Sequence, residues 1–523
     1  MPEIALEPTL DEVRSLAAEP GVRRVPVKRE LMSDSITPIE AMRAIREASA
    51  HCFLLESAEP DERAGRWTFL GFNPTVELTC AEGLLTITRN VESPSADAAD
   101  CVPTVERSRT DHPGDAIRAL LADHASAAPE GFPPFTGGLV GYFSYDYLKY
   151  AEPTLRRADI DHGDFLDVDL MLFDTVIAFD TYRQRLVLVT GVEVPADSAS
   201  GSAAAPSDAA DPLAAAYAAA SRRLDEVASI LFSGPRHAFE PLSLDGELVP
   251  RFDTAEFCDI VNRAKHHIRE GDIFQVVPSN PRTAPATGSL FDAYRILRGS
   301  NPSPYMFYFT SDAIELAGAS PETLAKLTDG RLTTYPLAGT RPRGVTPEED
   351  AEVEAGLLAD EKELAEHDML VDLGRNDLGR VSKIGSVHVD EYRNILKFSR
   401  VMHIGSTVTG ELADGKDAVD VIDAILPAGT LSGAPKIRAC QIIADLEGAS
   451  RGVYGGAIGY LDFTGNLDTC IAIRLAYKKD GRVCVQSGAG IVADSVPESE
   501  DAECANKARA VIEALHAAEG GVA

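Results

Sequence analysis

Two Glu-x-x-Glu steps, far apart in the sequence, are the residues most suited to chemistry. Glu363 and Glu366 lie in one segment that is predicted to be helical, and Glu500 and Glu503 lie in a second. Residues three apart project from the same side of a helix, so each helix can direct two carboxylates at one point. Four converging carboxylates repel one another unless a hard cation lies among them, and oxygen ligands suit Mg²⁺. For either pair alone, a solvated helix face is the ordinary alternative.

Other residues could complete a pocket for a small dianion. Two turns (Gly339-Thr340 and Gly488-Ala489-Gly490) offer main-chain N–H donors, Arg474 and Lys507 offer positive charge, and Tyr454 and Thr430 offer neutral hydrogen bonds. His403 and Glu322 are candidate proton carriers. A packed structural histidine and a capping or solvated carboxylate are the alternatives for these two. The residues alone predict a receptor for a small dianion held by magnesium and arginine.

Composition narrows the class of protein. The 523 residues include 82 acidic and 49 basic side chains, a net charge of −33 that disfavours nucleic acid and anionic membranes as partners. The eight cysteines form no C-x-x-C pair, which favours reduced thiols over disulfides or zinc. The chain starts without a signal-type apolar core and has no run long enough to span a membrane, so we expect a cytoplasmic protein.

The elements that must position these residues follow from hydrophobic patterning. Runs such as CFLLES, RWTFLGF and LMLFDTVIAFD predict strands, and RFDTAEFCDIVNRAKHHIREG predicts an amphipathic helix that ends at Gly271. Residues 192–221 are rich in Ala, Ser, Asp and Pro and are interpreted as a long insertion or flexible excursion. We expect an N-terminal region over 1–249 and a catalytic domain over 250–523 in a mixed α/β protein built on large sheets.

A series of motifs in the second half resembles one enzyme family. In order they are GDIFQVVPS, GASPET, PLAGTRPRG, EHDMLVDLGRNDLGRV, VMHIGS, PAGTLSGAPKIRA, YGGAIGY, DTCIAIR, SGAGIVADS and ESEDAECANKA. They resemble the chorismate-utilising enzymes, and among these the large (aminase) subunits of anthranilate synthase. The matching motifs are closely spaced from about residue 250 to 515. The resemblance implies an anthranilate synthase-like fold, α/β of the α+β type. In this fold, large mixed or antiparallel sheets pack as a sandwich with helices outside.

The resemblance also implies roles for the candidate residues. Glu366 and Glu503 resemble direct Mg²⁺ ligands, and Glu363 and Glu500 resemble residues that hold its waters. Tyr454, Arg474 and the amides of Gly488, Ala489 and Gly490 resemble the grip on the enolpyruvyl carboxylate of chorismate, with Lys507, Gly339 and Thr340 completing the anion shell. Glu322 resembles the general acid and His403 the residue needed for pyruvate elimination, and Thr430 and Gln275 are counted with these catalytic residues.

Two positions discriminate within the family. Gln275 stands where water-using isochorismate and salicylate synthases carry a lysine base, so ammonia is the expected nucleophile. Ala338 stands where many aminodeoxychorismate synthases carry a lysine, and its presence favours amination to anthranilate. The expected reaction is the Mg²⁺-dependent conversion of chorismate and ammonia to anthranilate and pyruvate, the first step of tryptophan biosynthesis. Aminodeoxychorismate synthase component I and isochorismate or salicylate synthase are the alternatives within the family.

The source of ammonia and the control of the enzyme are also predicted. The sequence has no nucleophile-elbow cysteine of the glutaminase type, so a separate glutamine amidotransferase subunit is expected to supply ammonia from glutamine. LLES and NPSPYM resemble segments that bind tryptophan as a feedback inhibitor, through Glu56, Ser57, Pro304, Tyr305, Met306, Gly459 and Cys470. The alternative to tryptophan binding is a purely structural role, with LLES as a strand end and NPSPYM as a core loop. The alternative of another class is a catalytically inactive, tryptophan-binding regulatory protein.

Overall fold

Two large β-sheets form the centre of the molecule. The computed structural model describes residues 5–57, 65–91, 102–157, 160, 165–195, 211–397 and 401–522. Sheet A, with 12 strands, has the order β1 (Arg24–Met32), β10 (Arg185–Glu193), β9 (Val176–Asp180), β3 (Trp67–Phe72), β2 (Cys52–Glu56), β15 (Tyr305–Thr310), β16 (Glu315–Ser320), β25 (Leu475–Lys479), β26 (Arg482–Gly488), β14 (Ser279–Thr287) and β11 (Ser243–Leu244), with β12 (Val249–Pro250) also on β14.

Sheet B also has 12 strands. Its order is β19 (Leu337–Pro342), β21 (Val401–Glu411), β18 (Arg331–Thr334), β17 (Thr323–Thr328), β24 (Leu467–Ile471), β23 (Ala457–Asp462), β7 (Gly138–Phe143), β8 (Val168–Phe173), β4 (Val76–Ala81), β5 (Leu84–Arg89) and β6 (Thr104–Arg109), with β20 (His388–Lys397) also on β21. A two-stranded sheet pairs β13 (Gln275–Val276) with β22 (Gly433–Ala434). Every pairing between these named strands is antiparallel.

The two sheets pack face to face over an aromatic core. Sheet A contributes Phe53 and Phe307, and sheet B contributes Tyr142 and Phe173, to one cluster of buried side chains. The rings of Phe53 and Phe173 meet edge to face with centroids 4.7 Å apart. Because successive side chains of a strand point to opposite faces, each sheet keeps a second apolar face for helices. The predicted sandwich is confirmed.

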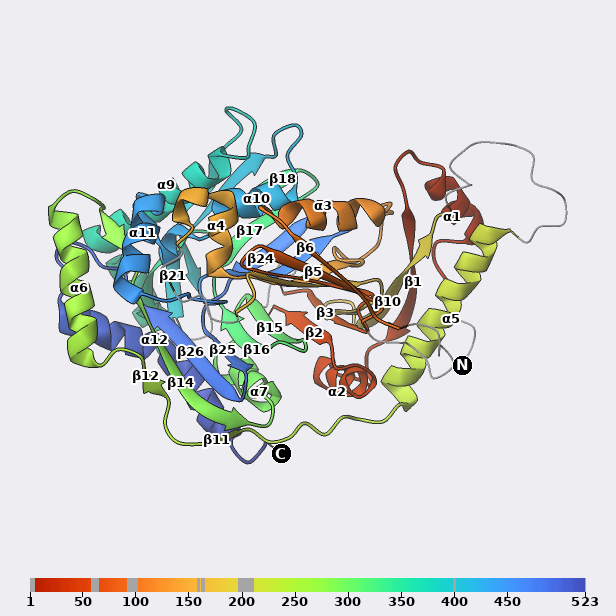
Figure 1. Ribbon diagram of the computed structural model, residues 1–523, viewed down its shortest axis with the longest axis horizontal. Coiled ribbons are helices and arrows are strands. Elements are labelled where there is room, and N and C mark those ends of the chain that lie inside the picture. The colour runs from red at the N-terminus through yellow and green to blue at the C-terminus, as the bar shows by residue number, and fades with distance from the viewer. Residues whose placement is uncertain are drawn as a thin grey trace.

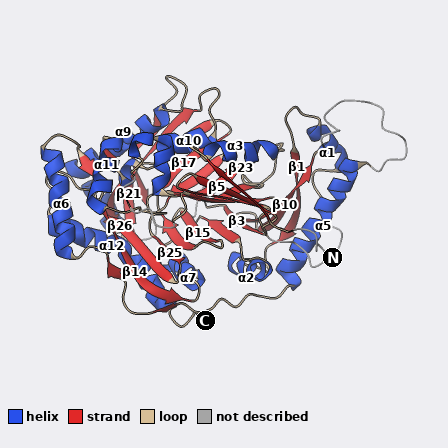
Figure 2. Ribbon diagram, viewed as in Figure 1, coloured by secondary structure: helices blue, strands red, loops and turns tan. Residues whose placement is uncertain are grey.

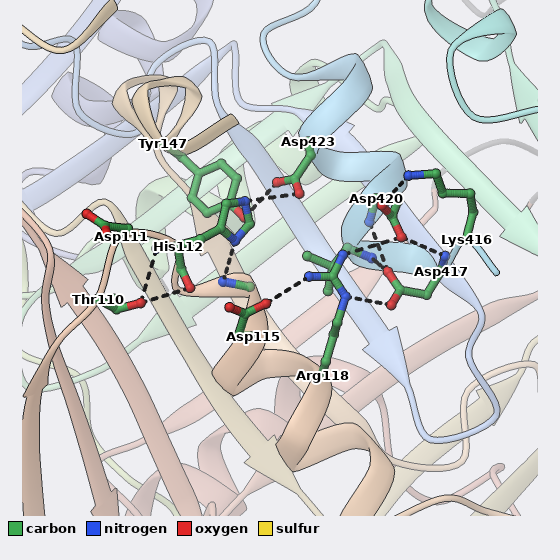
Figure 3. Close-up of polar contacts among 12 residues, drawn as sticks. Thr110, Asp111, His112, Asp115, Arg118, Tyr147, Lys416, Asp417, Asp420 and Asp423 are labelled. Atoms are coloured by element: carbon green, nitrogen blue, oxygen red, sulfur yellow. Dashed lines mark hydrogen bonds and ion pairs between the residues drawn. The ribbon is translucent and has the colours of Figure 1, made fainter. Parts of the chain in front are cut away.

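Helices cover the outer faces of the sandwich (Figures 1 and 2). On sheet A these are α2 (Pro38–Ala48), α5 (Pro212–Ser233), α7 (Phe291–Ser300) and α12 (Pro497–Ala518). On sheet B they are α3 (Gly114–Asp123), α9 (Glu361–Gly379) and α10 (Ala418–Ile425). The remaining helices are α1 (Leu10–Ala17), α4 (Leu148–Ala151), α6 (Thr254–Arg269), α8 (Pro347–Leu358) and α11 (Lys436–Glu447), with 3₁₀ turns η1 (Tyr145–Tyr147), η2 (Pro153–Leu155) and η4 (Gly429–Leu431).

Local sequence explains where the functional helices begin and end. The Asp253 carboxylate caps α6 by accepting from the Glu256 N–H, and the chain leaves this helix through Gly271 at φ +83°, as predicted. Asp360 caps α9 in the same way and so fixes the first turn that carries Glu363. No described helix is long and apolar enough to cross a membrane. The seven cysteines in the described ranges are all free thiols.

The predicted excursion over residues 192–221 contains regular structure at both of its ends. Strand β10 extends to Glu193, and α5 begins at Pro212, where Asp211 accepts a hydrogen bond from Leu213 N. The alanine-rich composition that suggested a flexible excursion also has high helix propensity, because alanine is the best helix former. Buried Leu224 and Val227 then anchor α5 on sheet A. Residues 196–210 of this segment lie outside the described residues.

Both sheets take strands from either side of the expected boundary at residue 249. In sheet A, β2 pairs with β15, and in sheet B, β7 pairs with β23. Figure 1 shows this interleaving as warm-coloured and cool-coloured strands side by side. The division into an N-terminal region over 1–249 and a catalytic domain over 250–523 stays a prediction, and both parts contribute strands to each sheet.

The aromatic core makes a prediction for stability. Replacing Phe53, which is fully buried between the sheets, by Ala should lower the free energy of unfolding by about 3–5 kcal/mol, because the truncated ring leaves a cavity. Urea denaturation followed by circular dichroism measures the change. Tyr182→Ala is the matched control, since this ring is 61% exposed. Equal stability of Phe53→Ala and the parent would contradict the assignment of this ring to the sandwich core.

Candidate active site

The two acidic helices come from opposite sheets and approach each other. Helix α9 packs on β19 and β21 of sheet B, whereas α12 packs on β26 of sheet A. Loss of hydration, and then repulsion from Glu363 and Glu503, raise the pKa of Glu366. Loss of hydration and repulsion from Glu503 raise the pKa of Glu500, against a lowering hydrogen bond from Ser495. The carboxylates of the two helices are therefore close enough to interact electrostatically.

Cations already neutralise two of these carboxylates. Arg341 Nη1 donates to Glu363 Oε1 at 3.0 Å, and Lys507 Nζ lies 2.8 Å from Glu503 Oε1. In the part of the chain that is described, no group of three or more His, Cys, Asp or Glu side chains is arranged to hold a metal ion. The donor set has the oxygen chemistry that Mg²⁺ prefers, but the predicted convergence into one closed group is not formed. Sequence reasoning did not single out Arg341, although its motif PLAGTRPRG was recognised.

A glycine turn lies against the α9 carboxylates. The pairing of β19 with β21 shifts register between Ala338 and Thr340, and Gly339 in the bulge has φ +61°. A Cβ atom at Gly339 would lie 2.9 Å from Leu357 Cδ1 and 3.3 Å from Glu363 Oε2. The predicted Gly339-Thr340 turn therefore needs glycine to approach Glu363 closely.

The predicted anion-binding residues are brought together at the end of β26. Arg474 Nη1 donates to Lys507 O at 3.1 Å, and Lys507 Nζ donates to Gly488 O at 3.2 Å. A Cβ atom at Gly488 would lie 3.1 Å from Tyr454 Oη, so the tyrosine hydroxyl meets the glycine turn directly. Burial lowers the pKa of Arg474, while Tyr454 and Glu503 act in the opposite direction. Arg474 also has φ +53°, a backbone conformation that concentrates at functional sites.

Gln275 lies against the same glycine turn, at Gly490. Its side chain is 7% exposed, and its Nε2 atom would lie 2.8 Å from a Cβ atom at Gly490. The Oε1 atom of Gln275 is buried with no hydrogen-bond partner among the described residues. Ala489, the middle residue of the glycine turn, is fully buried. A buried acceptor without a partner can receive an N–H donor from a bound molecule.

Glu322 and Thr430 form a hydrogen-bonded pair beside a small cavity. Thr430 Oγ1 donates to Glu322 Oε1 at 3.0 Å. Burial raises the pKa of Glu322 to about 7, against lowering effects of Thr430 and Lys507. Leu370 and Leu373 help to line the adjoining cavity of about 40 Å³. A carboxyl group with this pKa is partly protonated at neutral pH and can donate a proton.

His403 lies on β21, where its backbone pairs with Thr340 of β19. Burial lowers the pKa of His403, a hydrogen bond with the main chain of Gly339 raises it, and Arg474 lowers it. The imidazole is therefore neutral at neutral pH and able to accept a proton. It therefore lies beside the glycine turn of β19 and within electrostatic range of Arg474.

The residues predicted to bind tryptophan lie on neighbouring strands of both sheets. Glu56 of β2 is directly opposite Met306 of β15, and the Glu56 carboxylate accepts from Arg298 Nε at 2.6 Å and from the Tyr294 hydroxyl. Tyr305 Oη reaches across to sheet B and donates to Asp468 Oδ1 at 2.8 Å.

The remaining members of this set complete the same region. Pro304 immediately precedes β15, and Gly459 and Cys470 lie on the paired strands β23 and β24. The hydroxyl of Ser57 is buried without a hydrogen-bond partner among the described residues. The set therefore spans the junction of the two sheets and not a single strand.

Comparison with known proteins defines the class to which this fold and site belong. Residues 50–513 match the family described as chorismate binding enzyme, which is most of the chain. The protein belongs to this family.

Three relatives that share 34% identity or more with the chain are anthranilate synthase components. The chain is 42% identical to anthranilate synthase component 1 of Mycolicibacterium smegmatis, over 97% of this chain and 93% of the relative. It is 39% identical to anthranilate synthase component 1 of Acetivibrio thermocellus, over 98% and 99%. The crystal structure of anthranilate synthase component I from Streptococcus pneumoniae superposes with a TM-score of 0.69 at 34% identity, covering 86% of this chain and 92% of that one. The menaquinone-specific isochorismate synthase of Escherichia coli shares the fold, with a TM-score of 0.65 at 18% identity over 97% and 98%.

The Thr430–Glu322 hydrogen bond predicts a pH effect. Thr430 stabilises the ionised carboxylate, so Thr430→Val should raise the pKa of Glu322 above about 7. If protonated Glu322 is the active form, chorismate consumption falls as pH rises through this pKa. The alkaline limb of the pH–rate profile should then move upward by up to about one pH unit, the equivalent of one hydrogen bond to a charged group.

Thr430→Ser keeps the hydroxyl and is the control for this experiment. Its alkaline limb should coincide with that of the parent. An unmoved limb in Thr430→Val, in an enzyme that still turns over, would contradict the role of Glu322 as the titrating acid.

Proposed function

We propose that this protein is the chorismate-aminating component of an anthranilate synthase, which forms anthranilate and pyruvate from chorismate and ammonia in the first step of tryptophan biosynthesis. The observation that carries the proposal is the Glu322 carboxyl group, whose pKa burial raises to about 7, beside the cationic turn of Arg474 and Lys507. This pairing fits a dianionic substrate from which a hydroxyl group must leave as water. The relatives named anthranilate synthase component 1 support the same reaction.

Chorismate carries two carboxylates, and the site offers a receptor for each. Arg474, Tyr454 and the amides of Gly488–Gly490 would hold the enolpyruvyl carboxylate, with Lys507 beside them. Glu366 and Glu503 would bind Mg²⁺ directly, and Glu363 and Glu500 would hold its waters, near the ring carboxylate. When bound, the ion supplies positive charge that stabilises negative charge developing on the ring. The cations Arg341 and Lys507 would compete with it for Glu363 and Glu503.

Different side chains would act in the two chemical steps. Glu322 donates its proton to the C4 hydroxyl group, which leaves as water while ammonia adds at C2. Thr430 holds the resulting carboxylate. The buried Oε1 atom of Gln275 suits an N–H donor, and a neutral amide does not activate water. In the second step, His403 is required for the elimination of pyruvate, which makes the ring aromatic.

A separate glutamine amidotransferase subunit would supply the ammonia, in line with the component 1 names of the relatives. Tryptophan would bind at the junction of the sheets as a feedback inhibitor. The hydroxyl of Ser57, which has no hydrogen-bond partner among the described residues, and the carboxylate of Glu56 provide acceptors for its ammonium group, beside Met306 and Tyr305. These two acceptors support the proposed regulatory site.

Product analysis tests the reaction. Incubation of the full-length protein with chorismate, Mg²⁺ and ammonium should give anthranilate, detected by its fluorescence. Glu366→Gln should lower kcat by about 100-fold or more, the scale for losing a charged group that stabilises a transition state. Glu361→Gln is the control, because this exposed residue lies on the same helix outside the predicted set.

The identity of the product separates the alternatives. Aminodeoxychorismate or isochorismate in place of anthranilate would replace the proposed reaction with another of the same family. No product would favour a binding protein without catalytic activity.

Tryptophan inhibition tests the regulatory site. L-Tryptophan should inhibit the parent, and Ser57→Ala should weaken inhibition by about tenfold, because one hydrogen bond to a charged ammonium is lost. Ser300→Ala, at the exposed end of α7, should be inhibited like the parent. Parent rates that are unchanged by millimolar tryptophan would remove this site from the proposal.

A further inference from the structure

A buried ion pair lies behind the substrate turn and has no role in the reaction described so far. Glu447 ends α11, the chain turns through Gly448 at φ +61°, and Arg451 returns to the helix end. Arg451 Nε donates to Glu447 Oε2 at 2.9 Å and Arg451 Nη2 donates to Glu447 Oε1 at 2.5 Å. Arg451 is 2% exposed and Glu447 is 6% exposed. The two-point contact fixes the plane of the guanidinium group.

The guanidinium group also holds two loops that carry site residues. Arg451 Nη1 donates to Leu431 O at 2.7 Å, and Leu431 directly follows Thr430. Arg451 Nη2 donates to Val277 O at 2.6 Å, two residues after Gln275. One planar group therefore sets the spacing between the segment of Thr430 and the segment of Gln275.

The carboxylate of the pair reaches a third segment. Glu447 Oε1 accepts from Ser279 N at 2.7 Å and from Ser279 Oγ at 2.9 Å. Ser279 Oγ in turn accepts from Gln486 Nε2 at 2.8 Å. Gln486 lies two residues before Gly488, so this chain of contacts ends at the glycine turn that faces Lys507 and Tyr454.

The flat face of the guanidinium group contacts the aromatic part of the site. Its central carbon lies 4.6 Å from the ring centroid of Tyr145 and 5.8 Å from that of Tyr454. Tyr454 is the residue whose hydroxyl meets Gly488. Glu447 and Arg451 thus contact, directly or through one residue, all the segments that carry Thr430, Gln275, Tyr454 and Gly488.

We propose that Glu447 and Arg451 are a positioning pair for chorismate amination, which aligns the substrate turn with the Glu322–Thr430 acid. The proposal rests on the function proposed above. A buried ion pair contributes little net stability relative to apolar packing, so its value lies in fixing one arrangement of the segments it joins. Lysine cannot replace this arginine, because an ammonium group is a point charge without the planar fork that serves Glu447, Leu431 and Val277 at once.

The test compares two buried arginines in the full-length chain. Arg451→Lys should lower kcat/KM for chorismate by about 10- to 100-fold, the scale for losing a group that orients a site, with a raised KM. It should also move the alkaline limb of the pH–rate profile upward, because Thr430 no longer meets Glu322 correctly. Arg24→Lys is the matched control.

Arg24 has the same kind of environment far from these segments. It is 2% exposed, donates to Thr136 O at 3.3 Å and lies 4.7 Å over the ring of Phe463, but it belongs to β1. Arg24→Lys should lose a similar amount of thermal stability and keep the KM and pH profile of the parent. Should Arg451→Lys fail to fold, Glu447→Gln keeps the shape of the pair, and it should also raise KM and move the limb.

Calorimetric titration with chorismate separates this proposal from the function it rests on. A parent that binds chorismate without making anthranilate overturns the proposed reaction, and weaker binding by Arg451→Lys would still support the pair. A KM within about twofold of the parent and an unmoved pH limb, in folded Arg451→Lys or Glu447→Gln, overturn the positioning role. Equal kinetic losses in Arg24→Lys overturn it as well, since they would reflect general destabilisation.

Discussion

The packing of one sheet on the other is the constraint from which the site follows. Helix α9 is attached to sheet B and α12 to sheet A, so Glu366 and Glu503 are neighbours only while the sandwich is closed. Their mutual repulsion opposes this closure by about 1 kcal/mol per exposed pair. Each buried aromatic side chain of the core, such as Phe53 or Phe173, contributes about 1.5–3 kcal/mol in the other direction. The apolar core therefore holds these like charges near each other, and Lys507 offsets part of the repulsion through its contact with Glu503.

Local compensation of charge explains how a protein with a net charge of −33 can receive an anion. Arg474 and Lys507 are tied to each other and to Gly488 by main-chain hydrogen bonds, so their positions do not depend on a ligand. The charge of Lys507 lowers the pKa of Glu322, but burial raises it more. The carboxyl group therefore stays partly protonated. One enclosure thus contains both fixed positive charge and a transferable proton, as amination of a dianion requires.

The sequence was informative where function or structure is local. Apolar runs located the strands that became β2 and β8, and capping residues located α6 with its end at Gly271. Composition misled at residues 212–221, which were interpreted as part of a long insertion or flexible excursion and form the start of α5. Periodicity carries no information about which distant strands pair, so the interleaved order of the sheets could not be predicted.

For the candidate site as well, the sequence identified some features and missed others. The motifs identified the residues of the glycine turns and the acidic helices, and the fold brings Arg474, Lys507, Tyr454 and Gly488 together. The salt bridge of Arg341 with Glu363 escaped prediction, because a contact between a strand and a helix 22 residues apart leaves no periodic signal. The junction of Arg451 with Leu431 and Val277 escaped for the same reason, since its partners are carbonyl oxygens that any residue supplies.

The interleaved sheets also govern the order in which a nascent chain can fold. Strands β25 and β26, which span residues 475–488, lie between β16 and β14 inside sheet A, and β23 and β24 lie between β7 and β17 inside sheet B. The ribosome must therefore deliver almost the whole polypeptide before either sheet can close. Until then, strands such as β16 and β7 present unpaired edges, which are the surfaces that aggregate and that chaperones bind. Premature termination just before residue 457 would remove β23 to β26, and with them strands from the middle of both sheets.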